Sequence, residues 1–335
     1  MKAIRTARIT SRRAVRGLSL IELMVALVLG LLVVGSAIGI FISNRQTFRA
    51  TENLSRVQET ARMSYEMVSR DVREAAGNAC VNNVPVVNVI NGAAGNWWTN
   101  LSTWGDAFRG FGPAEALPGG PVFGAAPGNR VVGTEVVQLL SADDNVVTIS
   151  AHNTAGAEFT VNNASHGMAA GDLAIACNAR QASIFQVSSV VGAAIGHATG
   201  GAPGNCTDGL GLPLDCVAGT EYEYSAPNSV MAKLNASRWL VAINPAGRPA
   251  LYQVRLAGGV PQLEEIVEGV TGMQVLYRIE KIGPYLDAAT VGTNWPAVIA
   301  ARIELTLESP DSVGTDGNPI RRQVIQVSSL RNRNP

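Results

Sequence analysis

The chain has 335 residues, enough for one large domain or two small ones, and it carries 26 basic and 26 acidic side chains. Six of the basic residues and none of the acidic ones precede position 18, so the remainder has a net charge of −6, which argues against a nucleic-acid-binding surface. Aromatic residues make up only 5% and Gly is abundant, a composition that favours short strands and long loops over a helical body.

The first predicted element is the uncharged run Leu23–Ile42, which has 20 residues. As a helix it is roughly 30 Å long, enough to cross the hydrocarbon core of a bilayer. Because basic residues before a span tend to stay in the cytoplasm, we expect everything after Ile42 to be exported. Glu22 is the only charge between Leu18 and Ile42. A carboxylate at membrane depth is costly, so we expect its partner to come from another molecule.

The start of this run, Gly17-Leu18-Ser19-Leu20-Ile21-Glu22-Leu23, resembles the class III (type IV prepilin) signal. The resemblance implies that prepilin peptidase cleaves between Gly17 and Leu18 on the cytoplasmic face and that the new amino terminus of Leu18 is methylated. It also implies that Glu22 pairs with the terminal amine of a neighbouring subunit during assembly. The alternatives are a plain bitopic anchor and a secretory signal cut near Gly35-Ser36-Ala37.

Apolar side chains spaced three and four apart predict that the helix continues beyond Ser43 and ends before Gly77. The predicted stripe is Leu54, Val57, Ala61, Tyr65, Val68 and Val72. One half of such a helix spans the membrane and the other half needs a globular domain to cover its stripe, which is the pilin architecture. A juxtamembrane coiled coil is the alternative.

The segments that follow Gly77 are short and rich in β-branched residues, and they predict one β-rich globular domain with an antiparallel sheet. The expected strands are 84–90, 135–140, 146–151, 158–161, 173–177, 183–191, 238–243, 251–256, 263–277, 299–307 and 323–327. The domain organisation is therefore a basic leader (1–17), the membrane half of the helix (18–42), its amphipathic half (43–76) and the globular domain (77–335).

Aromatic residues gather in a Gly/Pro-rich stretch that follows the first expected strand. They are Trp97, Trp98, Trp104, Phe108 and Phe111. They either pin an irregular loop against the core or form a surface for a partner, because aromatic side chains anchor interfaces.

Four cysteines in an exported domain indicate two disulfides, for which three connectivities exist. We favour Cys206–Cys216, because both residues lie in one Gly/Pro-rich loop. That pairing leaves Cys80 for Cys177.

Three further segments are similar to the PilW family of type IV pilus minor pilins. They are Gly171–Cys177 with Ala182–Val187, Val267–Tyr277 and Ser328–Asn334. The resemblance implies an α+β, pilin-like fold: a long N-terminal helix packed on an antiparallel β-rich domain. Loops 91–133, 193–220 and 283–297 match nothing in that family's pattern.

No residue pattern indicates catalysis. His152, His166 and His197 are far apart in sequence and are expected on the surface or in loops. The pair Asp143-Asp144 and the residues Asp311 and Asp316 could hold Ca²⁺, but ordinary turn carboxylates are the simpler interpretation. We therefore expect a structural protein with no catalytic residue, no metal and no cofactor.

The family resemblance implies a minor pilin that helps to prime pilus assembly, sits at the pilus tip and supports twitching motility and adhesion. Its expected partners are other minor pilins, the major pilin, prepilin peptidase, the inner-membrane assembly platform and a tip adhesin. Its expected location is the inner membrane, with a periplasmic C-terminal domain, and then the pilus at the cell surface. The alternatives are a minor pseudopilin of a type II secretion system and, in another class, a membrane-anchored periplasmic enzyme or binding protein.

Overall fold

The computed structural model describes residues 19–77, 79, 84–92, 96–99, 107–279, 281, 283–314 and 316–333. Gly17, Leu18, Cys80 and Trp104 lie outside the described residues. The chain divides into two compact units, residues 1–52 and residues 53–335. We describe each unit by itself.

One helix, α1 (Leu20–Glu74), runs through 55 residues, as the sequence predicts. It ends two residues before the predicted end, because Ala76 adopts a left-handed conformation with φ 58°. Backbone hydrogen bonds then join this turn to the sheet: the Ala76 N–H donates to the Leu140 carbonyl at 2.9 Å, and the Ala142 N–H donates to the Gly77 carbonyl at 2.7 Å. The end of α1 is therefore fastened to the sheet by main-chain atoms.

The part of α1 in the second unit buries the predicted stripe unevenly. Val57, Val68 and Val72 are buried, whereas Leu54 and Tyr65 are only half-buried. The stripe is completed by small and polar side chains, because Asn53, Ser64 and Ser69 are also buried. Short side chains let the helix lie close to the strands beneath it.

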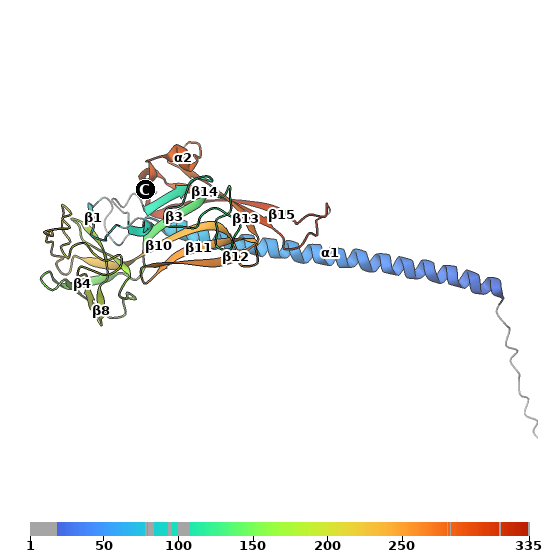
Figure 1. Ribbon diagram of the computed structural model, residues 1–335, viewed down its shortest axis with the longest axis horizontal. Helices are drawn as coiled ribbons and strands as arrows, with labels where there is room; N and C mark the ends of the chain where they lie inside the picture. The colour runs from blue at the N-terminus through green and yellow to red at the C-terminus, as the bar shows by residue number, and fades with distance from the viewer. Residues whose placement is uncertain are drawn as a thin grey trace, which may run out of the picture. The chain divides into compact units, whose positions relative to one another are not determined.

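Within the described residues, the larger sheet contains twelve strands and the smaller sheet three. The larger comprises β1 (Val86–Asn88), β2 (Phe108–Phe111), β3 (Val136–Ala142), β4 (Val147–Asn153), β5 (Glu158–Val161), β6 (Leu173–Cys177), β7 (Ala182–Gln186), β8 (Ser189–Val191), β9 (Ala194–Gly196), β10 (Val230–Ile243), β11 (Pro249–Ala257) and β12 (Val260–Glu268). The smaller comprises β13 (Val270–Arg278), β14 (Ala300–Glu308) and β15 (Arg321–Ser329). Figure 1 shows the long strands β10, β11 and β12 side by side.

The fold is α+β, as predicted, with a long N-terminal apolar helix and a β-rich domain whose described strand pairs are antiparallel apart from β1 with β7. The short helix α2 (Ala288–Val291) and the 3-10 turns Trp97–Thr99, Trp295–Ala297 and Arg331–Arg333 complete the described elements.

Two of the predicted strands are each divided in the structure. The segment predicted as 183–191 forms parts of β7 and β8, and the segment predicted as 263–277 forms parts of β12 and β13. Gly269 causes the second division, because its φ of 88° turns the chain from the larger sheet into the smaller one. Its N–H donates to the Pro249 carbonyl, and its carbonyl accepts from the Glu308 N–H. Hydrophobic periodicity continues across such a turn, so it did not reveal the break.

The aromatic residues after β1 belong to the core. Trp97, Trp98, Phe108 and Phe111 are each no more than 4% exposed. Trp97 and Phe111 also pack against the guanidinium of Arg238. For these four residues the core interpretation is confirmed and the partner-surface interpretation is wrong.

Candidate functional site

The first half of α1 presents an apolar surface. Its large apolar side chains from Leu20 to Phe48 are between 50% and 76% exposed. This part of α1 is long and apolar enough to cross a membrane, and none of the most apolar window is buried within the chain. Exposed apolar area of this extent requires a cover, either lipid or the helices of other subunits.

The acidic residue at the start of this surface is a helix-capping residue. The Ser19 N–H donates to Glu22 Oε2 at 3.0 Å, and the Glu22 N–H donates to Ser19 Oγ at 3.2 Å. This reciprocal pair is a capping box, which satisfies two backbone donors at the helix start. The S-x-x-E spacing is a local signal for such a box, whereas the sequence-based prediction considered only an intermolecular partner for Glu22. Cleavage at Gly17, methylation of Leu18 and pairing of Glu22 with a neighbour's amine stay predictions.

Where α1 enters the second unit, it is joined to the connection between β14 and β15. The Asn53 side chain donates to Asp311 Oδ2 at 3.2 Å and accepts from the Asp311 N–H at 3.3 Å. Asp316 accepts from the Asn318 N–H at 3.1 Å. Asp143 accepts from the Asn145 N–H at 2.9 Å. Asp143 and Asp316 thus act as ordinary turn carboxylates, and Asp311 as a link between helix and hairpin.

Asp71 is the carboxylate that attaches the end of α1 to the larger sheet. Its Oδ2 accepts hydrogen bonds from Trp239 Nε1 at 2.8 Å and from Gln253 Nε2 at 2.7 Å. Burial raises the pKa of Asp71 above its usual range, and these two donors act in the opposite direction. Sequence reasoning missed this residue. The available signal was its position three residues after Val68, on the buried side of the helix.

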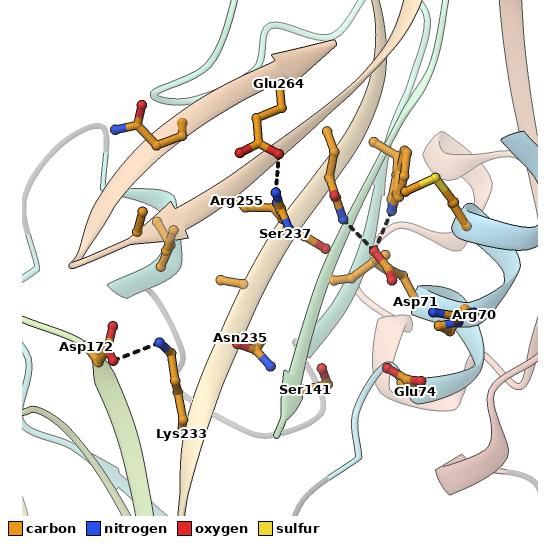
Figure 2. Close-up of a pocket in the computed structure, with 18 of the residues that line it drawn as sticks. Arg70, Asp71, Glu74, Ser141, Asp172, Lys233, Asn235, Ser237, Arg255 and Glu264 are labelled. Carbon is orange, nitrogen blue, oxygen red and sulfur yellow. Dashed lines mark hydrogen bonds and ion pairs between the residues drawn. The ribbon is translucent and has the colours of Figure 1, made fainter. Parts of the chain in front are cut away.

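A groove of about 770 Å³ begins beside Asp71, between α1 and the strands β3, β10, β11 and β12. Its α1 side is formed by Met67, Arg70, Asp71 and Glu74 in the last turns of the helix. Figure 2 shows two ion pairs beside it, with Ser141, Asn235 and Ser237 between them and Asp71. Lys233 pairs with Asp172 at 2.7 Å, and Arg255 pairs with Glu264.

The lysine, one arginine and three of the carboxylates of this groove are engaged with other lining residues. The lining residues, all within the described part of the chain, include no histidine and no cysteine. The serines there therefore have no adjacent imidazole base, and the lysine is held by a carboxylate. This arrangement does not form a nucleophile with its base.

His166 and His197 lie in loops, as the sequence predicts, but both are buried, whereas His152 lies on β4 and is partly exposed. His166 is 3% exposed and His197 is fully buried. Because β4 and β9 both pair with β5, His152 Nε2 lies 3.0 Å from His197 Nε2. The His152 ring stacks on Phe159, and its Nδ1 accepts from the Tyr224 N–H at 3.2 Å. The sequence did not reveal this cluster, because its residues are far apart along the chain.

Burial sets the protonation of the histidine pair. It lowers the pKa of His152 to about 4 and that of His197 to about 3, and the latter is further lowered by its neighbour. Both rings are thus neutral near pH 7. Because His152 Nδ1 accepts, its Nε2 carries the proton and donates to His197 Nε2. The pair is a structural contact between β4 and the residue that follows β9.

Gln186, in the segment from Gly171 to Val187, joins the loop that contains Gly171 to the loop that contains Gly204 and Asn205. Gln186 Nε2 donates to the Gly171 carbonyl at 2.9 Å, and its Oε1 accepts from the Gly204 N–H at 2.7 Å. The Asn205 side chain accepts from the Gln186 N–H and donates to its carbonyl. The Phe-Gln pair of this segment therefore has a physical role, because Phe185 fills the core and Gln186 fixes the loops.

The predicted Cys206–Cys216 disulfide is present. The second predicted pairing involves Cys80, which lies outside the described residues, and it stays a prediction. Its proposed partner Cys177 is fully buried at the end of β6.

Comparison with known proteins gives two family matches. The family model described as type IV pilus-assembly protein W (PilW) matches residues 238–332, and the model of the prokaryotic N-terminal methylation motif matches residues 12–38. No curated protein and no solved structure matches the chain. The resemblance predicted from the sequence is confirmed, and the matches and the apolar helix fit a membrane-anchored, pilin-like protein related to the type IV pilus.

Proposed function

We propose that this pilin-like protein is a minor pilin of the type IV pilus, part of the complex that primes assembly, and that it acts structurally rather than as an enzyme. The observation that carries the proposal is the apolar half of α1. Its side chains are exposed from Leu20 to Phe48, and the same helix continues into a half that is buried on a β-rich domain. A surface of this kind is stable in a bilayer and, after extraction, among other such helices.

Maturation prepares this helix for assembly. The basic leader, residues 1–17, is removed before Leu18, and the new terminus is methylated. Until assembly, the Glu22 carboxylate is satisfied by the Ser19 N–H within the same helix. During assembly it exchanges this weak partner for the charged amine of a neighbouring subunit, because an ion pair in a low-dielectric bundle is stronger than a bond to a neutral amide.

The domain order supports the same sequence of events. Residues 18–42 form the membrane and assembly half of the helix, residues 43–76 the amphipathic half, and residues 77–335 the globular domain. The chain starts in the inner membrane with its globular domain in the periplasm and ends in the pilus, at its tip. Its partners are the other minor pilins, the major pilin, prepilin peptidase, the assembly platform and a tip adhesin, and its loss impairs twitching motility and adhesion.

The test is incorporation of Glu22→Gln into pili. Gln keeps the size of the side chain and an acceptor for the Ser19 N–H but removes the charge. We expect the variant to be processed and to remain in the membrane fraction, with a loss of more than about tenfold from sheared pili. Glu66→Gln is the matched control, because Glu66 is an exposed acid on the same helix that pairs with Arg62 at 2.9 Å.

Incorporation of Glu22→Gln at the wild-type level would contradict the proposed role of the charge. A wild-type chain absent from sheared pili, in cells whose protein secretion fails when its gene is deleted, would assign the chain to a type II secretion system instead.

A further inference from the structure

The loop closed by Cys206–Cys216 is attached to the sheet through a buried residue, Leu210. Leu210 is 1% exposed, and its carbonyl accepts from Gln181 Nε2 at 2.7 Å and from Ser183 Oγ at 2.8 Å. Both donors lie at or beside β7. The loop is therefore anchored by the disulfide at one point and by the sheet at another.

The outer part of this loop satisfies its own polar groups. The Asp215 carboxylate accepts from the Val217 N–H at 2.8 Å and from the Ala218 N–H at 3.0 Å. The Thr220 hydroxyl donates to the Pro213 carbonyl at 2.6 Å. A tip that folds its backbone polar groups inward presents its side chains in a fixed arrangement.

The side chains presented at this tip are apolar. Leu212 is 39% exposed, Leu214 45% and Val217 98%. They fall within six consecutive residues: Leu212 and Leu214 lie inside the ring closed by the disulfide, and Val217 directly follows Cys216. Single exposed apolar residues are ordinary on protein surfaces, but three on one rigid loop form a surface that a partner can cover.

The charged side chains of this segment itself all have one sign. No lysine or arginine occurs between Arg180 and Lys233. Asp208, Glu221 and Glu223 are all exposed. Residues 209–211 and 219–221 lie side by side, since the Gly211 N–H donates to the Thr220 carbonyl at 2.7 Å, so Asp208 and Glu221 flank the base of the loop. The apolar tip is therefore carried by an acidic segment that has no basic residue of its own, and the exposed Arg180 lies in the turn whose Asn178 bonds the Tyr222 hydroxyl.

We propose that this surface, the disulfide loop 206–223, docks an exported protein that presents an apolar patch ringed by lysine or arginine side chains. The complementary charge selects this occupant. A phospholipid surface is anionic and would be repelled, and the same loop on a second copy would bring like charges together. The inference rests on the proposed function, because it takes the partner to be another component of the pilus.

The experiment places a photo-crosslinking amino acid at position 217 of the full-length chain in cells. Position 132 serves as the matched control, because Val132 is an exposed apolar residue, 73% exposed, outside the loop. The partners tested in those cells are the other pilin-like subunits and the secreted pilus-associated proteins, each detected in the adduct by its own antibody. We expect one of them to form the adduct at position 217 and not at position 132, through a segment rich in lysine or arginine.

Purified protein then gives the magnitudes with the partner that forms the adduct. We expect Leu212→Ser/Leu214→Ser/Val217→Ser to weaken binding about tenfold or more, because apolar anchors carry most of an interface's affinity. We expect Asp208→Asn/Glu221→Gln/Glu223→Gln to weaken it about threefold or more and to remove most of its salt dependence. All six side chains are surface residues, so an intact Cys206–Cys216 disulfide and an unchanged melting temperature are expected in both variants.

An adduct with lipid or with a second copy, no adduct at position 217, or unchanged binding by either triple variant would overturn the inference. Incorporation of the unmodified chain into sheared pili is measured in parallel. If incorporation fails while the adduct with a non-pilus protein forms, the proposed function is wrong. The loop then still binds an apolar patch ringed by lysine or arginine, but on a protein outside the pilus. If incorporation succeeds without the adduct, the docking surface alone is refuted.

Discussion

Removing the Asp71 carboxylate tests how α1 is attached to the sheet. In Asp71→Ala, Trp239 Nε1 and Gln253 Nε2 both lose their acceptor, and these residues are no more than 7% exposed. A buried donor without a partner costs about 1–3 kcal/mol. The buried carboxylate's own desolvation is recovered at the same time, so the expected net loss in the free energy of unfolding is about 2–4 kcal/mol.

Asp71→Asn separates the hydrogen bonds from the charge. Its amide oxygen can take the position of Oδ2 and accept from both donors, so we expect a loss within about 1 kcal/mol at pH 7. Burial raises the pKa of Asp71, so the folded state holds the proton to a higher pH than the unfolded state. The stability of the wild type relative to Asp71→Asn is therefore greatest below the ordinary pKa and falls as the pH rises through the folded value.

The assay is urea unfolding of the full-length protein in detergent, followed by tryptophan fluorescence at pH 7 and at two lower pH values. Glu66→Ala is the control, because this exposed side chain contributes little. Equal stability of Asp71→Ala and Asp71→Asn would refute the reasoning, since the two differ in the acceptor that they leave for Trp239 and Gln253.

Two further predictions concern the core. A Cβ at Gly110 would overlap Tyr277 Oη, so Gly110→Ala should lower the free energy of unfolding by about 2 kcal/mol or more. Tyr277→Phe should change that free energy by less than about 1 kcal/mol, because the buried hydroxyl has no hydrogen-bond partner among the described residues. Calorimetry measures the stability of both variants. Because the pKa values of His152 and His197 are lowered in the folded state, the unfolded state binds protons at a higher pH than the folded state does. The contribution of the two neutral histidines to the free energy of unfolding is therefore fully present above pH 6.5. It declines as the pH falls toward about 4, by up to about 1.4 kcal/mol per pH unit for each histidine. His152→Gln should flatten that decline, and an unchanged pH profile would count against a buried neutral pair.

Features that depend on neighbouring residues could be predicted from the sequence. The long helix follows from the apolar run and the stripe after it, and β5 and β6 have the predicted bounds because alternation and apolar runs are local signals. The Cys206–Cys216 disulfide could be predicted as well, because its two cysteines share one loop.

Features that depend on distant residues could not be predicted. The contact between His152 and His197 requires that β4 and β9 share β5, which no local pattern encodes. The partners of Asp71 come from β10 and β11, more than 160 residues away along the chain. The capping role of Glu22 was a local signal that was overlooked, because the cost of a charge at membrane depth directed attention to an external partner.

The amino terminus of the mature chain tests the central claim most directly. Mass spectrometry would be applied to the protein from cells with and without prepilin peptidase. The account predicts a methylated Leu18 that disappears when the peptidase is absent. An intact Met1, or a terminus near Ala37, would contradict it and return the chain to the anchored or secreted periplasmic proteins.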